Sequence, residues 1–110
     1  MLTARAHNFL YANSSLEDTI SRLQSFETAG ADVLFAPGLP DLASVRAVCA
    51  AASKPFNFMA GIKGKSFSVR DLAAAGVRRI SLAASLYRAA MSGFLDRCVT
   101  TPELNNVMGI

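Results

Sequence analysis

Cysteine is scarce in this chain, and its scarcity limits both the chemistry and the compartment. Only two cysteines, Cys49 and Cys98, occur among 110 residues, too few for the disulfide framework on which small secreted domains depend. Both fall within helical patterns, so we expect buried free thiols rather than a disulfide or a metal-binding pair. The N-terminus also lacks a charged-then-apolar leader, which favours a cytoplasmic protein.

Long apolar runs and clustered charges are missing as well. No run approaches the roughly 20 apolar residues of a membrane-spanning helix. The net charge is +3, from 11 basic and 8 acidic residues, and the basic residues form no stripe with interleaved aromatic side chains of the kind that binds nucleic acid. We therefore predict that neither a membrane nor a nucleic acid is a partner.

Four short apolar runs, each followed by an amphipathic helix, make up most of the sequence. The runs cover residues 1–6, 32–36, 55–60 and 79–84. Strands that alternate with helices at this spacing pair in parallel, because each helix is the crossover between neighbouring strands. Four such units are half of a TIM (β/α)8 barrel. We predict a single α/β domain over residues 1–110 with this half-barrel architecture.

Polar residues mark where the helices between these runs begin. Ser15 with Asp18, and Ser68 with Asp71, have the spacing of a capping box, in which a serine side chain accepts from a backbone amide. Asp41 is a suitable N-cap for the helix between them. These signals predict three helices that cross over between the four strands.

A half-barrel leaves surfaces without a partner. A complete barrel needs roughly 250 residues, and an isolated four-stranded parallel sheet has two unpaired edges and one poorly covered face. We expect a last helix, capped by Ser85, that carries the apolar residues Leu86 and Phe94 and is followed by a helical turn over residues 103–107. The chain is still expected to form a homo-oligomer or to associate with a missing half.

Several segments, in order along the chain, resemble the isocitrate lyase and phosphoenolpyruvate mutase (phosphonomutase) family. The resemblance covers essentially the whole chain and matches the C-terminal half of such a protein, barrel strands five to eight. Met1 would then stand inside strand five, which implies a chain truncated at its N-terminus. The segments are TARAHNFL at residues 3–10, DTISRLQSFETAGADVLF at 18–35, PFN at 55–57, LAAAGVRRISL at 72–82 and ELN at 103–105.

The resemblance implies an activity and a metal. Members of this family cleave or form C–C or P–C bonds next to a carboxylate, and they stabilise an enolate with Mg²⁺. The chain is therefore expected to come from a magnesium-dependent lyase or mutase with a small carboxylate or oxo-acid substrate. The family's magnesium ligands are acidic residues on earlier strands, so we expect no metal ligand in this chain and no activity from it alone.

The resemblance assigns Arg5 and Asn57 to substrate binding. Arg5 ends the first strand, where barrel active sites form, and a guanidinium group matches a carboxylate in bidentate fashion. The alternatives are an Arg5 that pairs with Asp32 or with solvent, and an Asn57 amide that serves neighbouring strand ends. His7 replaces an acidic residue of the family and is a candidate catalytic base. The favoured alternative is a loop histidine that only forms hydrogen bonds.

Two features after the middle strands bear on the chemistry. Pro37 stands where the lyases place a glutamate and the mutases a histidine, and its side chain can neither transfer a proton nor form a hydrogen bond. The loop GIKGKS at residues 61–66 ends like a phosphate-binding loop, but Met59 replaces the expected first glycine. Lys63 and Lys65 are candidate anion-binding residues, although a solvated lysine loop is the favoured interpretation.

The remaining basic pair, Arg78 and Arg79, precedes the last strand and is interpreted as surface charge. The leading hypothesis is thus a family enzyme of which this chain supplies the substrate-binding side. One alternative is a non-catalytic half-barrel that dimerises, or binds a partner, through its exposed sheet edges. The other is a small anion-binding module built on residues 61–66.

Overall fold

The computed structural model describes residues 1–12 and 15–100, and its strands form one parallel sheet. The strands are β1 (Thr3–Arg5), β2 (Val33–Phe35), β3 (Phe56–Met59) and β4 (Arg79–Ser81), in the order β1-β2-β3-β4. Every neighbouring pair is parallel. This arrangement confirms the predicted four parallel βα units. The strands are shorter than the apolar runs from which they were predicted.

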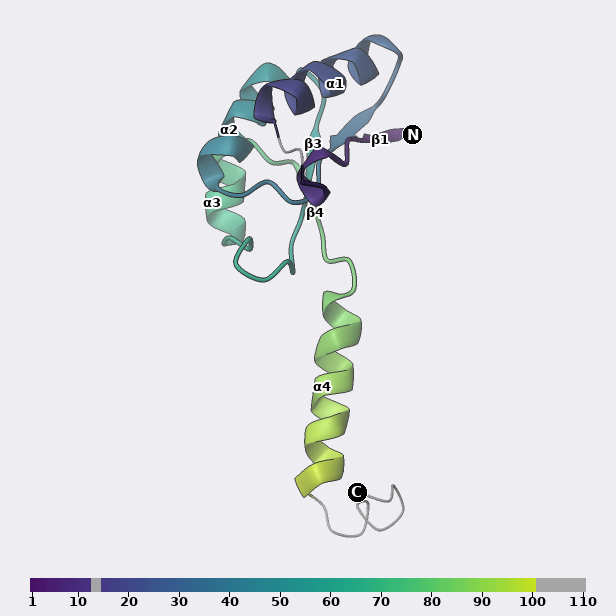
Figure 1. The fold of residues 1–110 in the computed structure, drawn as a ribbon, viewed down its shortest axis with the longest axis vertical. Helices are drawn as coiled ribbons and strands as arrows, with labels where there is room; N and C mark the ends of the chain where they lie inside the picture. Colours follow the sequence, from purple (N-terminus) through teal and green to yellow (C-terminus); the bar gives the residue numbers. More distant parts are fainter. Residues whose placement is uncertain (13–14, 101–110) are drawn as a thin grey trace.

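Three helices lie on one side of the sheet (Figure 1). They are α1 (Leu16–Thr28), α2 (Leu42–Ala51) and α3 (Val69–Ala74). The side chains of Ser15, Asp41 and Ser68 each accept a hydrogen bond from the amide three residues later, which confirms the predicted caps. A short 3-10 helix, η1 (Asn8–Leu10), follows β1. The helical turn predicted over residues 103–107 lies outside the described residues.

The core lies between the sheet and these helices. Side chains alternate between the two faces of a strand, and the helix-facing positions of β2 and β3 are fully buried. Cys98 is buried, as predicted, whereas Cys49 is only half-buried; both thiols are free. Partial burial raises the pKa of the Cys49 thiol. The large buried side chains are Leu34, Phe56 and Phe58 of the sheet, Leu23 of α1, Val45 and Val48 of α2, and Leu72 of α3.

The opposite face of the sheet, called the open face below, carries a polar row. Strand register places Arg5 beside Phe35, Phe35 beside Asn57, and Asn57 beside Arg79. Residues that pair across strands share a face, so all of these side chains belong to the open face. Thr3 and Val33 precede the row on this face, and Met59 and Ser81 follow it.

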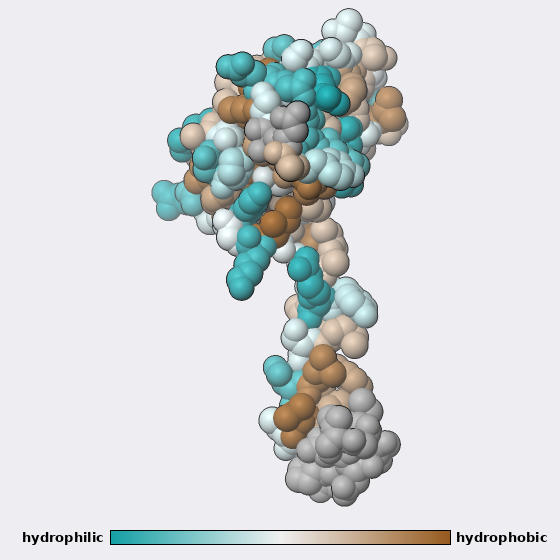
Figure 2. All heavy atoms as spheres, viewed as in Figure 1, coloured by the Kyte–Doolittle hydropathy of each residue, from teal (hydrophilic) through white to brown (hydrophobic). Residues whose placement is uncertain are grey.

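The last helix, α4 (Ser85–Thr100), leads away from the sheet (Figure 1). Leu86 and Phe94 are 69% and 52% exposed, so these apolar side chains of α4 lie at the surface and not in the core. Figure 2 shows apolar side chains gathered at the surface of this part of the molecule. β4 turns only Ile80 toward the core, which gives α4 little to pack against, and Ala83 adopts a left-handed φ of +48° just before the helix.

None of the described helices is long and apolar enough to cross a membrane.

Gly61 permits the close approach of α4 to the end of β3. Its φ is +103°, and a Cβ atom there would lie 1.7 Å from the Ser85 hydroxyl oxygen. Gly61→Ala is expected to lower the free energy of unfolding by about 2–3 kcal/mol, through backbone strain together with this clash. Gly30→Ala is the matched control, because Gly30 has the same φ and nothing within 4 Å; we expect a loss of about 1 kcal/mol. Equal losses in urea denaturation would contradict the role of Ser85.

Glu27 fastens the end of α1 to the connection between α2 and β3. One of its carboxylate oxygens accepts from the amides of Ser53 and Lys54 at 2.7 and 2.9 Å, and the other accepts from the Ser53 hydroxyl at 3.1 Å. Partial desolvation acts to raise the pKa of Glu27, but the hydrogen bonds outweigh it and lower the pKa below its ordinary 4.5. The carboxylate therefore stabilises the fold above that pH, and the contribution is lost as the pH falls toward the lower folded-state pKa.

We expect Glu27→Gln to lower the free energy of unfolding at pH 7 by about 1 kcal/mol, because the group is partly solvated. Below about pH 4 the difference from the wild type should shrink, since the wild-type carboxyl then takes up its proton. Urea unfolding of both proteins at pH 7 and pH 3.5 measures this. Glu17→Gln, on the same helix, serves as control, and a difference that is constant with pH would rule out the assignment.

Candidate functional site

Arg5 lies at the carboxyl end of β1 and has no carboxylate partner among the described residues. Its guanidinium carbon is 5.1 Å from the centroid of the Phe35 ring, a cation–π contact that holds the group while leaving its N–H edge open. Among the described residues the only ion pair joins Arg22 and Asp18. The Asp32 carboxylate accepts from the amide of Leu2 at 2.7 Å. The alternative ion pair with Asp32 does not form, and Arg5 is exposed, as the solvent alternative requires. Substrate binding by Arg5 stays a prediction.

Asn57 is held by hydrogen bonds on both sides of its amide. Its Nδ2 donates to the Ser81 hydroxyl at 3.0 Å, and its Oδ1 accepts from Arg79 Nε at 2.9 Å. The residue is 2% exposed. These hydrogen bonds agree with the alternative interpretation, in which the Asn57 amide serves neighbouring strands and not a substrate. The amide keeps one further N–H and one further lone pair, so a role in substrate binding stays a prediction.

Arg79 is the residue that the sequence analysis missed. It is exposed, as a surface charge would be, but its Nη2 also donates to Thr3 Oγ1 at 2.9 Å. Thr3 and Arg79 belong to the two edge strands of the sheet, so one side chain spans the open face from β4 to β1. The start of β4 at residue 79, level with Asn57, was the available signal, because it puts both side chains on one face.

His7 lies apart from this row. It follows β1 at the start of η1, and its ring centroid is 6.4 Å from that of Tyr11. It lines a pocket of about 260 Å³ that neither Arg5 nor Asn57 lines, and catalysis by His7 stays a prediction. The other residues around this pocket are Asn8, Tyr11, Asp18 and Arg22.

The segments after β2 and β3 are tied to each other. Pro37 is fully buried, and Lys65 Nζ donates to the carbonyl oxygen of the adjacent Gly38 at 3.1 Å. The amide of Gly61 donates to Ser66 Oγ at 3.0 Å, so this amide of the loop is turned inward. In the described part of the chain Lys63 has no side-chain partner. Anion binding by Lys63 and Lys65 stays a prediction.

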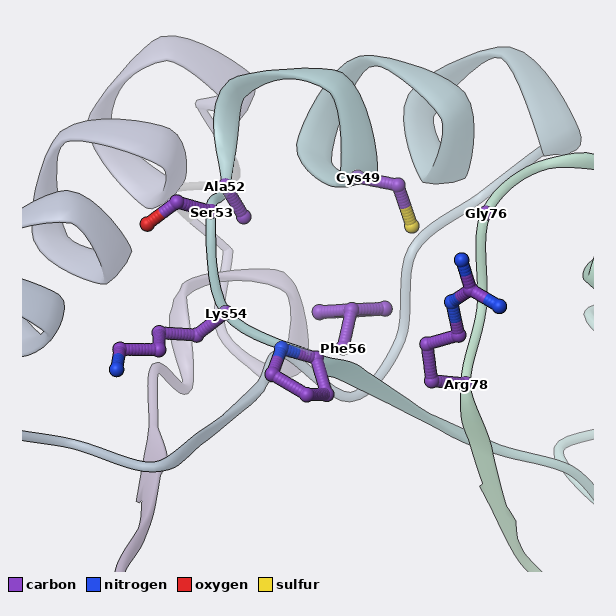
Figure 3. Close-up of a pocket in the computed structure, with 8 residues that line it drawn as sticks. Cys49, Ala52, Ser53, Lys54, Phe56, Gly76 and Arg78 are labelled. Atoms are coloured by element: carbon purple, nitrogen blue, oxygen red, sulfur yellow. The ribbon is translucent and has the colours of Figure 1, made fainter.

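A second pocket, of about 320 Å³, lies at the opposite end of the strands (Figure 3). Figure 3 shows the side chains of Cys49 and Arg78 directed into it, whereas Lys54 points away from Arg78. Phe56 begins β3 and Arg78 precedes β4, so this is the amino end of the sheet. Ligands of parallel α/β folds bind beyond the carboxyl ends of the strands.

The described residues do not fit a magnesium site. Within residues 1–12 and 15–100, no group of three or more His, Cys, Asp or Glu side chains could hold a metal ion. The row on the open face holds the cations Arg5 and Arg79 and no carboxylate, whereas Mg²⁺ binds through carboxylate oxygens.

The described residues thus form four parallel βα units, with an arginine at the carboxyl end of β1 that makes no ion pair among them; this arrangement is typical of one part of a barrel-type α/β fold. The family model described as phosphoenolpyruvate phosphomutase matches residues 1–100. The chain therefore belongs to the phosphoenolpyruvate mutase family, which confirms the predicted relationship. No curated protein matches the chain.

Solved structures agree with this assignment. A candidate lyase/mutase from Burkholderia cenocepacia J2315 is 45% identical, with a TM-score of 0.83 over 90% of this chain and 35% of that one. A candidate phosphonomutase from the same organism is 34% identical, with a TM-score of 0.73 over 88% and 40%. Oxaloacetate acetylhydrolase in complex with the inhibitor 3,3-difluorooxalacetate is 25% identical, with a TM-score of 0.72 over 94% and 38%. The chain thus spans well under half of the chains that it matches, as a half-barrel does.

Proposed function

We propose that this chain is the C-terminal half of a lyase or mutase that cleaves or forms a C–C or P–C bond next to a carboxylate. Membership of the family and the 35–40% share of the relatives' chains support this. The observation that carries the proposal is Arg5, exposed at the carboxyl end of β1, stacked on Phe35 and without an acidic partner in the described residues.

The open face suits the binding of a small carboxylate or oxo-acid. Arg5 would donate to the carboxylate, with Asn57 supplying a further N–H. Arg5 and Arg79 would favour negative charge that develops as the enolate forms. Pro37 has no group that transfers a proton, so at this position the chain supplies neither an acid nor a base, and its proposed part is substrate binding and charge stabilisation. Ligands for the Mg²⁺ that the family resemblance implies would come from outside the described residues, and the chain alone would be inactive.

The charge of the open face bears on what completes the barrel. If two copies closed on each other, two guanidinium groups from each, Arg5 and Arg79, would share one interior with no carboxylate among the described residues of that face. Burying unpaired like charges costs several kcal/mol. We therefore propose that an acid-bearing half, rather than a second copy, covers this face.

The two free thiols suit our proposal of a reducing cytoplasm.

A titration of the chain with oxalate and with 3,3-difluorooxalacetate, followed by ¹H–¹⁵N spectra, tests the proposed site. We expect shifts at the Arg5 side chain, at Phe35 and at the Asn57 amide. Arg5→Met should weaken binding at least tenfold, or about 1.4 kcal/mol, because it removes the charge-assisted bonds. Arg70→Met, which removes an exposed arginine of α3, should leave the affinity unchanged. Equal affinity in the wild type and Arg5→Met would contradict the proposal.

A second candidate function, the non-catalytic half-barrel that dimerises, is favoured by the exposed apolar side chains of α4. Sedimentation velocity at several concentrations and salt levels separates the two. Repulsion between open faces predicts no stable dimer through the sheet at low ionic strength, with any association strengthening as salt screens the charges. Leu86→Ser with Phe94→Ser identifies association through α4. A salt-independent dimer would favour the second candidate, and these substitutions show whether it forms through α4 or through the sheet edges.

The third candidate, a small anion-binding module, has less support. Lys65 already donates to the Gly38 carbonyl, and an anion would have to displace that bond. If the loop over residues 61–66 binds phosphate, phosphate should raise the melting temperature of the wild type and not of Lys65→Ala.

A further inference from the structure

The orientation of the Asn57 amide depends on one neighbour. An asparagine amide can turn by half a rotation and exchange its oxygen and nitrogen. A guanidinium group only donates hydrogen bonds, so the Asn57 atom 2.9 Å from Arg79 Nε is the oxygen. The Ser81 hydroxyl, 3.0 Å from the amide nitrogen, can donate or accept and would tolerate either orientation. Of these two contacts, only the one with Arg79 determines the orientation of the Asn57 amide.

Arg79 is itself fixed at both ends. Its backbone pairs with Asn57 in the register of β3 and β4, and its Nη2 donates to Thr3 Oγ1 on β1 at 2.9 Å. Because Asn57 is 2% exposed, water offers little alternative to these partners. A buried amide that turned its nitrogen toward Arg79 would place donor against donor and leave both unsatisfied.

The fixed orientation determines what a ligand meets. Ser81 pairs with Met59, two residues beyond Asn57, so the amide nitrogen lies on the side of the strands' carboxyl ends. One of its two hydrogens is used by Ser81, and the other has no partner among the described residues. We infer that Arg79 is a positioning residue that holds Asn57 as a hydrogen-bond donor toward the site, which selects ligands that present acceptor oxygens. The ligand class rests on the proposed function, whereas the orientation does not.

The orientation is measured directly in the whole chain by NMR. In the wild type we expect NOEs from the Asn57 side-chain amide hydrogens to the Ser81 side chain. Arg79→Met should weaken these NOEs at least threefold or split the amide signals, because nothing then decides between the two orientations. Arg79→Lys should restore them, since lysine is also only a donor. Thr3→Val, which removes only the far anchor, should leave them in place.

Two results would overturn the inference. One is a set of Asn57–Ser81 NOEs that is the same in Arg79→Met as in the wild type. The other is a set that Arg79→Lys fails to restore while the backbone spectrum stays native. If Arg79→Met does not fold, Arg79→Gln gives the same comparison, because glutamine can donate or accept and permits both orientations.

A second arm compares oxalate with oxamate, in which an amide replaces one carboxylate and adds donors. We expect the wild type and Arg79→Lys to prefer oxalate by tenfold or more, and Arg79→Met or Arg79→Gln to prefer it by less than threefold. An unchanged preference in these variants would overturn the selective role of Arg79. Absence of oxalate binding, with the wild-type NOEs intact, would refute the proposed function and confirm the orientation.

Discussion

Parallel pairing of the four strands is the constraint on which the rest of the structure depends. Because every strand runs the same way, all carboxyl ends meet at one edge of the sheet. Leu34 and Phe56, which are almost completely buried under the helices, fix which face each strand turns inward. A slip of one residue in β3 would expose Phe56 and move Asn57 from the open face into the apolar core. The hydrophobic core and the polar row are therefore two consequences of a single register.

The sequence predicted most of what depends on local signals. Ser15, Asp41 and Ser68 act within a few residues of themselves, and the structure confirms each as a cap. The four strands follow in the same way from short apolar runs. The contact of Arg79 with Thr3 joins residues 76 positions apart and depends on how far the sheet curls. The direction of α4 depends on the surface that β4 offers, which no local pattern of the helix encodes.

The candidate site shows the same division. The position of Arg5 at a strand end followed from the length of an apolar run, and the structure places it there. That Arg5 stacks on Phe35, rather than pairing with Asp32, follows from register and from the bond that Asp32 makes to the amide of Leu2. The hydrogen bonds of the Asn57 amide to Ser81 and Arg79 could not be predicted either, because they depend on the register between β3 and β4. The types of residue thus predict which functional groups lie on a sheet face, whereas the contacts among these groups depend on the register of the strands.

Parallel register can be measured through scalar couplings across backbone hydrogen bonds in the ¹⁵N,¹³C-labelled chain. The structure predicts couplings from the amide of Ala6 to the carbonyl of Phe35, from Leu34 to Pro55, and from Ala60 to Ser81, across distances of 2.9, 2.9 and 2.8 Å. Observation of all three would establish the row of Arg5, Phe35, Asn57 and Arg79 on one face. Couplings of an antiparallel pattern, or a register shifted by one residue, would contradict the half-barrel and the site built on it.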